Sequence, residues 1–259
     1  MSDVPDVPER PVVLVTGAAH RLGREIALDL AAHGHDVAVH YRASAEAAAE
    51  TVARIGALGA RGVALQADLS DESACCRLVP EVLERFARLD AVVNNASTFE
   101  HDDVRSFGHA AMERHWRANT APALLLARAL HDHLETRQAR GTVINLLDQK
   151  LWNPNPDFLS YTLSKAALHA ATLLLAQALA PRVRVCGVAP GLTLASDLID
   201  DARLKQLQAK SLLGQGPSGG DIAGAVRFLL QAQAITGAIL VVDAGQHLQP
   251  AGRDPAFMA

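Results

Sequence analysis

Short apolar runs alternate along the chain with longer segments in which apolar residues recur at helical spacing. The first run, residues 11–16, is continuously apolar up to its last residue, as expected of a strand buried on both faces of a parallel sheet. Leu22, Ile26 and Leu30 then mark one face of a helix, and Gly34 follows as its C-terminal glycine. The beginning of the chain therefore predicts a strand, a turn and an amphipathic helix.

The same unit recurs along the chain. Strands alternating with helices of ordinary length predict βαβ units. We therefore expect an α/β fold: one doubly wound domain of Rossmann type, with a mostly parallel seven-stranded sheet and helices on both faces. The further predicted strands are residues 36–41, 62–68, 89–97, 141–148, 183–191 and 238–245, and the further helices are an Ala/Glu-rich segment to about 60, 71–88, 112–140, 158–180 and a segment capped by Asp221 that runs to about 231.

One long segment interrupts this alternation. Residues 192–220 combine a polar, helix-like piece with a Gly/Pro/Ser cluster and follow a late strand. Ligands of open α/β sheets bind beyond the carboxyl ends of the strands, so we expect this segment to be a mobile lid over a substrate. The expected organisation is a disordered tail at residues 1–10, one domain at 11–248, and a C-terminal tail at 249–259.

Composition narrows the class of protein. The chain has 259 residues with 24 Lys+Arg and 28 Asp+Glu, a net charge of −4, and no local basic stripe, so we expect no nucleic-acid partner. Its apolar stretches are interrupted before they reach membrane-spanning length, and its first residues do not resemble a signal peptide. The three cysteines form neither a disulfide framework nor a metal-ligand pattern. We expect a cytoplasmic protein without a membrane partner.

The turn after the first strand is a candidate phosphate site. It reads TGAAHRLG over residues 16–23, where Gly17 permits a tight turn and the N–H groups at the start of the helix can hold a pyrophosphate. The match to G-x-G-x-x-G is partial, because Arg21 stands at a middle glycine position. A βα turn that binds nothing is the alternative. The positive charge of Arg21 favours an anionic ligand.

The end of the second strand indicates which dinucleotide would bind. An NAD site usually has a carboxylate there for the ribose hydroxyls, whereas an NADP site has an arginine for the 2′-phosphate. This chain has no carboxylate at that place, and Arg42 favours NADP(H); a solvated surface arginine is the alternative. The residues concerned are His40, Tyr41, Arg42, Ala43 and Ser44.

Tyr161 and Lys165 form a candidate proton-transfer pair. Residues four apart lie on one face of a helix, so the ammonium can sit near the phenol. A nearby positive charge would lower the pKa of Tyr161 and fit it for proton transfer. Tyr and Lys are rare in this chain, so the spacing seldom arises by chance.

Taken together, the motifs resemble the short-chain dehydrogenase/reductase superfamily. They occur in that family's order and spacing from residue 11 to about 247, and the resemblance implies NAD(P)-dependent hydride transfer. The motifs are the turn at residues 16–23, Asp68, the run Asn94, Asn95, Ala96 and Ser97, then Asn119, the Tyr161/Lys165 pair, and the run Pro190, Gly191, Leu192 and Thr193.

Two departures from the family's common pattern indicate a branch. Arg21 replaces a glycine, and Asp148 replaces the serine that stands thirteen residues before the catalytic tyrosine. Both changes are similar to the pteridine reductase branch, which includes dihydromonapterin and dihydrobiopterin reductases. Phe99, two residues after Ser97, also fits that branch.

The resemblance implies a role for each matched residue. NADPH would contact Gly17, His20, Arg21, Leu22, His40, Tyr41, Arg42, Ala43, Ser44, Asp68, Leu69, Asn95, Ala96, Ser97, Tyr161, Lys165, Pro190, Gly191, Leu192 and Thr193. A pterin ring would stack on Phe99 and bond to Arg21 and Ser97. Asp148 and Tyr161 would deliver a proton to the ring nitrogen beside the carbon that takes the hydride, Lys165 would hold the ribose, and Asn119 would position a water.

The hydrogen-bonding capacity of the Asp148 carboxylate also indicates which class of substrate would bind. A serine hydroxyl donates to a carbonyl oxygen, whereas a carboxylate donates only when protonated and better suits an N–H-bearing heterocycle. The residue therefore argues against an ordinary ketone substrate. The alternative is a strand-end Asp that caps a backbone N–H, and for Phe99 the alternative is an ordinary core aromatic.

Other readings of the chain remain open. A short-chain reductase of a carbonyl or imine is the alternative within the same class, and a catalytically idle NADP-binding sensor is the alternative outside it. The eleven histidines show no metal-ligand spacing, so we expect no metal. The resemblance further implies a homotetramer that pairs through the helices near residues 124–130 and 166–175.

Overall fold

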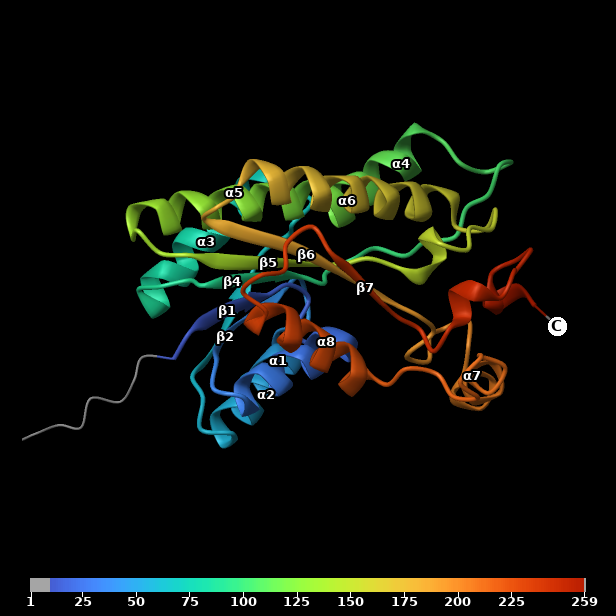
Figure 1. Ribbon diagram of the computed structural model, residues 1–259, viewed down its shortest axis with the longest axis horizontal. Coiled ribbons are helices and arrows are strands. Elements are labelled where there is room, and N and C mark those ends of the chain that lie inside the picture. The colour runs from blue at the N-terminus through green and yellow to red at the C-terminus, as the bar shows by residue number, and fades with distance from the viewer. Residues whose placement is uncertain (1–9, 259) are drawn as a thin grey trace, which may run out of the picture.

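Strand β1 (Val12–Val15) pairs in parallel with β2 (Asp36–Tyr41) on one side and with β4 (Ala91–Asn94) on the other. The sheet continues through β3 (Gly62–Gln66) beyond β2, and through β5 (Gly141–Leu146), β6 (Val183–Pro190) and β7 (Ile239–Val242) beyond β4. The computed structural model describes residues 10–258, and there the order β3-β2-β1-β4-β5-β6-β7 forms one parallel sheet (Figure 1). The predicted doubly wound sheet is confirmed.

Helices cover both faces of this sheet (Figure 1). One face carries α1 (Arg21–Ala32), α2 (Ala45–Ala57) and α8 (Gly219–Gln231), and the other carries α3 (Glu72–Phe86), α5 (Ala121–Thr136) and α6 (Leu159–Ala178). Two shorter helices, α4 (His109–His115) and α7 (Asp201–Gln208), lie toward the carboxyl ends of the strands. No helix within residues 10–258 is long and apolar enough to cross a bilayer.

The core consists of two apolar layers, one on each face of the sheet. Val13 and Val15 of β1 belong to one layer with Leu30 of α1, and Leu14 belongs to the other with Leu126 of α5. All of these side chains are buried, and burying a side chain of this size contributes about 1.5–3 kcal/mol. The uninterrupted apolar runs of the sequence reflect this burial on both faces.

The helix predicted at residues 112–140 differs from the observed one. It begins earlier, at His109, is interrupted by a π-helical segment, η1 (Trp116–Thr120), and ends at Thr136. Pro122 has no N–H to bond the carbonyl four residues before it, which accounts for a break in the regular pattern at this point. The hydrophobic spacing alone gave no sign of the π segment.

The N-cap of the last helix is also a different residue from the one predicted. Ser218, not Asp221, is the N-cap of α8, and its hydroxyl accepts a hydrogen bond of 3.2 Å from the N–H of Asp221. The carboxylate of Asp221 accepts a bond of 2.8 Å from the N–H of Ser218. The two residues therefore form a reciprocal capping box, in which Asp221 occupies the third helical position.

The two predicted terminal tails differ in how much of each the structure describes. Residues 1–9 of the predicted N-terminal tail lie outside the described residues. The C-terminal segment is described to residue 258 and contains a short 3-10 turn, η4 (Pro255–Phe257). Asn153 Nδ2 donates a hydrogen bond of 2.5 Å to the carbonyl of Gln249, so this segment packs beside the loop after β5.

Candidate active site

Two glycines bring the turn after β1 against its neighbours. Gly17 has a φ of +65°, which glycine adopts without steric cost, and a Cβ there would lie 3.1 Å from the Cα of Ala96. A Cβ on Gly23 of α1 would lie 2.2 Å from the carbonyl oxygen of Gly17. The first turn of α1 can therefore pack directly on the end of β1, the arrangement in which helix N-termini bind phosphate.

Thr16 fastens this turn to the chain that follows β4. Its hydroxyl donates to the carbonyl of Val93 at 3.3 Å and accepts from the N–H groups of Asn95 and Ala96, both at 2.9 Å. The Asn95 amide returns a bond of 2.9 Å to the carbonyl of Thr16 and one of 3.3 Å to the carbonyl of Gly17. The sequence analysis assigned no role to Thr16, although its position at a strand end, directly before a glycine turn, could have indicated one.

His40 lies beneath the turn. Its Nδ1 accepts a hydrogen bond of 3.0 Å from the N–H of Gly17, and its Nε2 lies 3.1 Å from the carbonyl of Ala67, so the proton is on Nε2. Burial lowers the pKa of His40 below its ordinary value, which keeps the ring neutral. Both ring nitrogens are thus engaged by the protein, and the side chain braces the turn.

The N-terminus of α1 is open to an anion. Within this described helix, His20 makes no side-chain cap and the first turn contains no acidic residue, so the helix itself places no carboxylate at its N-terminus. Arg21 follows with a φ of +50°, a left-handed conformation that costs a non-glycine residue about 1–2 kcal/mol. The Arg that replaces the expected glycine therefore keeps a glycine-like backbone.

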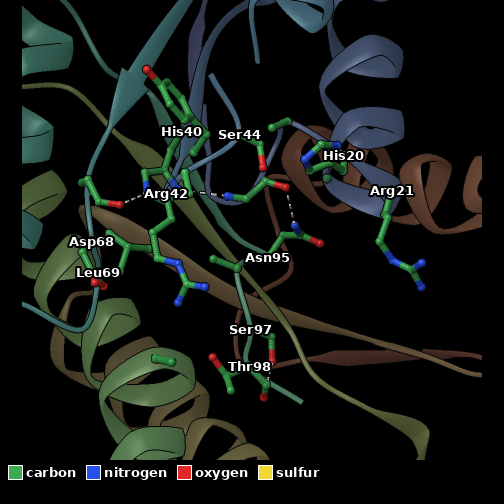
Figure 2. A pocket seen from close by; sticks show the side chains of 18 of the residues that line it. His20, Arg21, His40, Arg42, Ser44, Asp68, Leu69, Asn95, Ser97 and Thr98 are labelled. Carbon is green, nitrogen blue, oxygen red and sulfur yellow. Dashed lines mark hydrogen bonds between the residues drawn. The ribbon is translucent and has the colours of Figure 1, made fainter. Parts of the chain in front are cut away.

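A cavity of about 420 Å³, here called the turn cavity, opens above these residues. Figure 2 shows Arg42 reaching into it from the end of β2, between Asp68 and the turn. Hydrogen bonds from Ser70 lower the pKa of Asp68, with a smaller contribution from the Arg42 charge. The predicted residues that line the turn cavity are Gly17, His20, Arg21, Leu22, His40, Tyr41, Arg42, Ala43, Ser44, Asp68, Leu69, Asn95, Ala96 and Ser97.

Asp148, Tyr161 and Lys165 meet at the end of β5 and on α6. The Tyr161 hydroxyl donates a hydrogen bond of 2.8 Å to Asp148 Oδ2, and the N–H of Lys150 donates one of 2.8 Å to Asp148 Oδ1. Lys165 Nζ donates to the carbonyl of Leu146 at 2.7 Å and lies 5.8 Å from the centre of the Tyr161 ring. Asp148 is therefore both a cap of a backbone N–H and a partner of the tyrosine.

The electrostatics of this group differ from the prediction for Tyr161. Burial, followed by the Asp148 charge, raises the pKa of Tyr161 well above its ordinary value, so the expected lowering was wrong for the protein alone. Burial also raises the pKa of Asp148 and lowers the pKa of Lys165 to about 8. Asp148 stands closer to the phenol than the ammonium does, and therefore the hydroxyl keeps its proton and can donate it.

Asn119 lies in the π-helical segment and fastens the loop after β4. Its Oδ1 accepts from the N–H of Thr98 at 2.7 Å, and its Nδ2 donates to the carbonyl of Thr98 at 3.0 Å and to Ser164 Oγ at 2.9 Å. The Ser164 hydroxyl in turn donates to the carbonyl of Tyr161 at 2.6 Å. The side-chain amide is thus engaged by protein groups that connect to the tyrosine.

Phe99 belongs to an aromatic cluster beside Tyr161. Its ring stacks on Phe158 with a centroid distance of 4.1 Å and meets Tyr161 edge-on at 4.6 Å, while 48% of the residue stays exposed. Phe257 of the C-terminal segment stacks on Phe158 at 5.7 Å. Sequence reasoning assigned no role to Phe158 or Phe257, because no spacing rule connects residues so distant along the chain.

A second cavity of about 350 Å³, here called the tyrosine cavity, adjoins the first. Both cavities are lined by Arg21, Leu22, Asn95 and Ser97, so they adjoin at these residues near the carboxyl ends of the strands. Three residues of the C-terminal segment, Asp254, Pro255 and Ala256, also line it. The predicted residues here are Arg21, Leu22, Asn95, Ser97, Phe99, Asp148, Tyr161, Lys165, Pro190, Gly191, Leu192 and Thr193.

Comparison with known families identifies the class of protein. The family profile described as short chain dehydrogenase matches residues 11–206. The chain belongs to the short-chain dehydrogenase/reductase family. Its members are NAD(P)-dependent oxidoreductases, which agrees with a sheet and a cleft of this form.

Two solved structures and one curated relative show how far the similarity extends. FolM alternative dihydrofolate reductase 1 from Brucella suis, in complex with NADP, is 38% identical with a TM-score of 0.88, covering 92% of this chain and 96% of that one. The Brucella canis protein, complexed with NADP, is 37% identical with a TM-score of 0.86, covering 92% and 95%. The 3-oxoacyl-(acyl-carrier-protein) reductase FabG of Staphylococcus aureus is 32% identical over 91% of this chain and 97% of its own length.

Proposed function

We propose that this protein is an NADPH-dependent reductase that transfers a hydride to a C=N bond of a dihydropterin-like substrate. The observation that carries the proposal is the 2.8 Å hydrogen bond from the Tyr161 hydroxyl to Asp148. A carboxylate occupies the place where the family commonly has a hydroxyl donor, and it lines the same cavity as the exposed ring of Phe99. This pairing supports a flat, nitrogen-containing substrate more than a simple ketone.

The turn cavity fits a dinucleotide. A Cβ on Gly23 would clash with the Gly17 carbonyl, and one on Gly17 would lie only 3.1 Å from the Cα of Ala96. Since α1 also has no side-chain cap there, the turn has the close approach that a pyrophosphate needs. The N–H groups from His20 to Leu22 would bind the phosphates, while Asp68 and Leu69 would lie at the adenine. NADPH, when bound, supplies the hydride.

Arg42 supports NADPH over NADH. It extends into the turn cavity from the end of β2, where this chain has no carboxylate for the ribose hydroxyls (Figure 2). A guanidinium there would pair with the 2′-phosphate, and Ser44 can add a hydroxyl donor. The two similar Brucella proteins are complexed with NADP, which agrees with this choice.

The tyrosine cavity would hold the substrate. Phe99, which is half-exposed, offers an aromatic surface in its lining. Arg21 and Ser97 line both cavities, so they can bond the polar edge of a ring there. Pro190, Gly191, Leu192 and Thr193 also line the cavity, and they would contact the nicotinamide. Residues 192–220, which include α7, would close the cavity as a lid.

Proton delivery follows from the hydrogen bonds of the protein. The Tyr161 hydroxyl donates its proton to the substrate nitrogen directly or through a water, and Asp148, whose pKa is raised, shares and replaces that proton. The Lys165 ammonium is held by the Leu146 carbonyl and would bind the nicotinamide ribose. Asn119 would act by positioning the loop at Thr98 and, through Ser164, the backbone of Tyr161.

The alternative substrate is a carbonyl compound. The similarity to a 3-oxoacyl-(acyl-carrier-protein) reductase favours it, because that protein acts on a ketone as its name states. A catalytically idle NADP-binding sensor fits less well. The Tyr161 hydroxyl is hydrogen-bonded to Asp148 and the Lys165 ammonium to a backbone carbonyl, so the groups for proton transfer are assembled. A homotetramer paired through α5 and α6 fits the exposure of Leu174, which is 65% exposed on α6.

A substrate panel tests the proposal. NADPH oxidation is measured at fixed enzyme concentration with 7,8-dihydrobiopterin, 7,8-dihydropterin, an acetoacetyl thioester and simple ketones. We expect turnover with both dihydropterins, and a Tyr161→Phe variant that retains NADPH binding but loses most of that turnover. If NADPH is oxidised only when ketones are present, the substrate is a carbonyl compound and not a pterin. If the Tyr161→Phe variant keeps its function in the cell, the sensor hypothesis is favoured.

A further inference from the structure

Gln149 lines both the tyrosine cavity and a smaller cavity beside it. It follows Asp148 directly and begins the 3-10 turn η2 (Gln149–Leu151). It lines the tyrosine cavity and also a cavity of about 130 Å³, here called the rear cavity. Leu192, Gln246 and Pro255 line both as well, so the two cavities adjoin at these residues.

The side-chain oxygen of Gln149 lacks a partner. Its Oε1 is buried and accepts no hydrogen bond from any described residue. Among residues 10–258, the other buried side-chain polar atom without a hydrogen-bond partner is Nη1 of Arg10, which is a donor. A buried acceptor without a donor is unfavourable, and native proteins rarely keep one. The oxygen is therefore free to accept a hydrogen bond from a donor group that reaches it.

The groups near Gln149 are already hydrogen-bonded to one another. The N–H of Leu192 donates to Gln246 Oε1 at 3.0 Å, and Gln208 Nε2 donates to the carbonyl of Leu192 at 2.9 Å. These bonds join α7 and the loop after β6 in one network. Gln149 lies beside this network without taking part in it.

The rear cavity has defined walls. Leu207 and Gln208 of α7 form one side, and Pro250 and Ala251 of the C-terminal segment form another. Its volume of about 130 Å³ is less than half that of the tyrosine cavity, which is about 350 Å³. A short polar substituent suits this smaller space.

Ion pairs hold the C-terminal wall in place. The buried Nζ of Lys150 donates to the carbonyl of Asp157 at 2.6 Å and pairs with Asp254 Oδ2 at 3.3 Å. Arg253 Nε pairs with the Asp157 carboxylate at 2.8 Å, and the N–H of Asp254 donates to the same carboxylate at 2.8 Å. Because Lys150 also donates its N–H to Asp148, the wall of the rear cavity and the catalytic carboxylate share one anchor.

We propose that Gln149 is a substrate-binding residue: its side-chain oxygen accepts a hydrogen bond from an O–H or N–H group on a short substituent of the dihydropterin ring, and the rear cavity holds that substituent. The inference rests on the proposed function, because the ring itself is assigned to the tyrosine cavity. It adds a specificity determinant for the substituent, separate from the group that donates the proton.

Two substrates that differ only in the substituent test this assignment. We compare 7,8-dihydrobiopterin, which carries a dihydroxypropyl group, with unsubstituted 7,8-dihydropterin. Gln149→Met keeps the size of the side chain and removes the acceptor, Ala251→Phe fills the rear cavity, and Gln233→Met, an exposed position after α8, is the matched control. NADPH binding is followed by fluorescence and folding by thermal unfolding.

The expected result is selective. Gln149→Met raises KM for dihydrobiopterin roughly tenfold and leaves KM for dihydropterin and NADPH binding within about twofold, since one buried hydrogen bond is lost. Ala251→Phe has the same selectivity, and Gln233→Met changes neither substrate. If the unmodified enzyme reduces both substrates and Gln149→Met affects them equally or not at all, the Gln149 assignment alone fails. If the unmodified enzyme reduces neither, the proposed function fails and the assignment falls with it.

Discussion

The hydroxyl of Tyr161 donates a hydrogen bond of 2.8 Å to Asp148, while the ammonium of Lys165 is directed to the carbonyl of Leu146. The nearest charged group to the phenol oxygen is therefore a carboxylate. This arrangement favours a tyrosine that holds its proton until the substrate nitrogen needs it, and it gives the protein a second acid beside the first.

Replacing Asp148 by serine tests the substrate preference directly. Asp148→Ser restores the hydroxyl that the family commonly has, so we expect kcat for dihydropterin to fall about 100-fold and ketone turnover to rise above that of the unmodified enzyme. Steady-state NADPH oxidation with both substrates measures this, and Asp148→Asn is the control that supplies neither an acid nor a hydroxyl. Unchanged pterin turnover in Asp148→Ser would remove the carboxylate from the mechanism.

The pH dependence should reflect Lys165. Its pKa of about 8 means that the ammonium is present below that pH and is lost as the pH rises through it. The proton on Asp148 is likewise lost with rising pH, at higher pH than for an exposed aspartate because burial raises its pKa. We therefore expect kcat/KM for dihydropterin to fall with increasing pH across about 7–9. A profile that rises throughout this interval contradicts the proposed acid role.

Much of this fold could be predicted from the sequence, because strands buried on both faces leave unbroken apolar runs such as residues 11–16. The Tyr161/Lys165 pair could be found because helical spacing connects them. The hydrophobic spacing, by contrast, did not show the π segment that precedes Pro122. The stacking of Phe158 on Phe257 depends on a contact across about a hundred residues of chain. Local patterns do not encode such contacts.

The raised pKa of Tyr161 could not be predicted for a related reason. The sequence shows Lys165 one turn away, but which charge lies nearer to the phenol depends on how β5 presents Asp148 to α6. Spacing within one helix predicts neighbours on that helix only. A residue from a strand end, brought in by the sheet, decides the sign of the shift.

Arg21 should combine a stability cost with a binding role. Its φ of +50° is relieved by glycine, so Arg21→Gly should raise the free energy of unfolding by about 1 kcal/mol and Tm by about 2–4 °C. The same variant should raise KM for dihydropterin roughly tenfold, since one charge-assisted contact is lost. Arg21→Ala, measured beside it, should lose the binding without gaining the stability. Equal thermal unfolding of both variants would show that the left-handed backbone carries no strain.

Arg42 should determine cofactor preference. Arg42→Ala should raise KM for NADPH at least about tenfold and change KM for NADH less than about twofold, because only NADPH has the 2′-phosphate. Arg54→Ala, an exposed arginine on α2, is the matched control for loss of surface charge. Parallel titrations with both cofactors give the two constants. Equal changes for NADPH and NADH contradict the assignment of Arg42 to the phosphate.

The most direct test of the central claim follows the hydride itself. NADPH carrying deuterium on the transferable position of its nicotinamide ring is mixed in a single turnover with stoichiometric enzyme and 7,8-dihydrobiopterin, and the product is analysed by mass spectrometry. We predict a tetrahydropterin that contains one deuterium on the carbon of the former C=N bond, with the proton on the adjacent nitrogen exchanging with water. Recovery of unlabelled dihydrobiopterin, while the same enzyme deuterates a ketone, would contradict the claim.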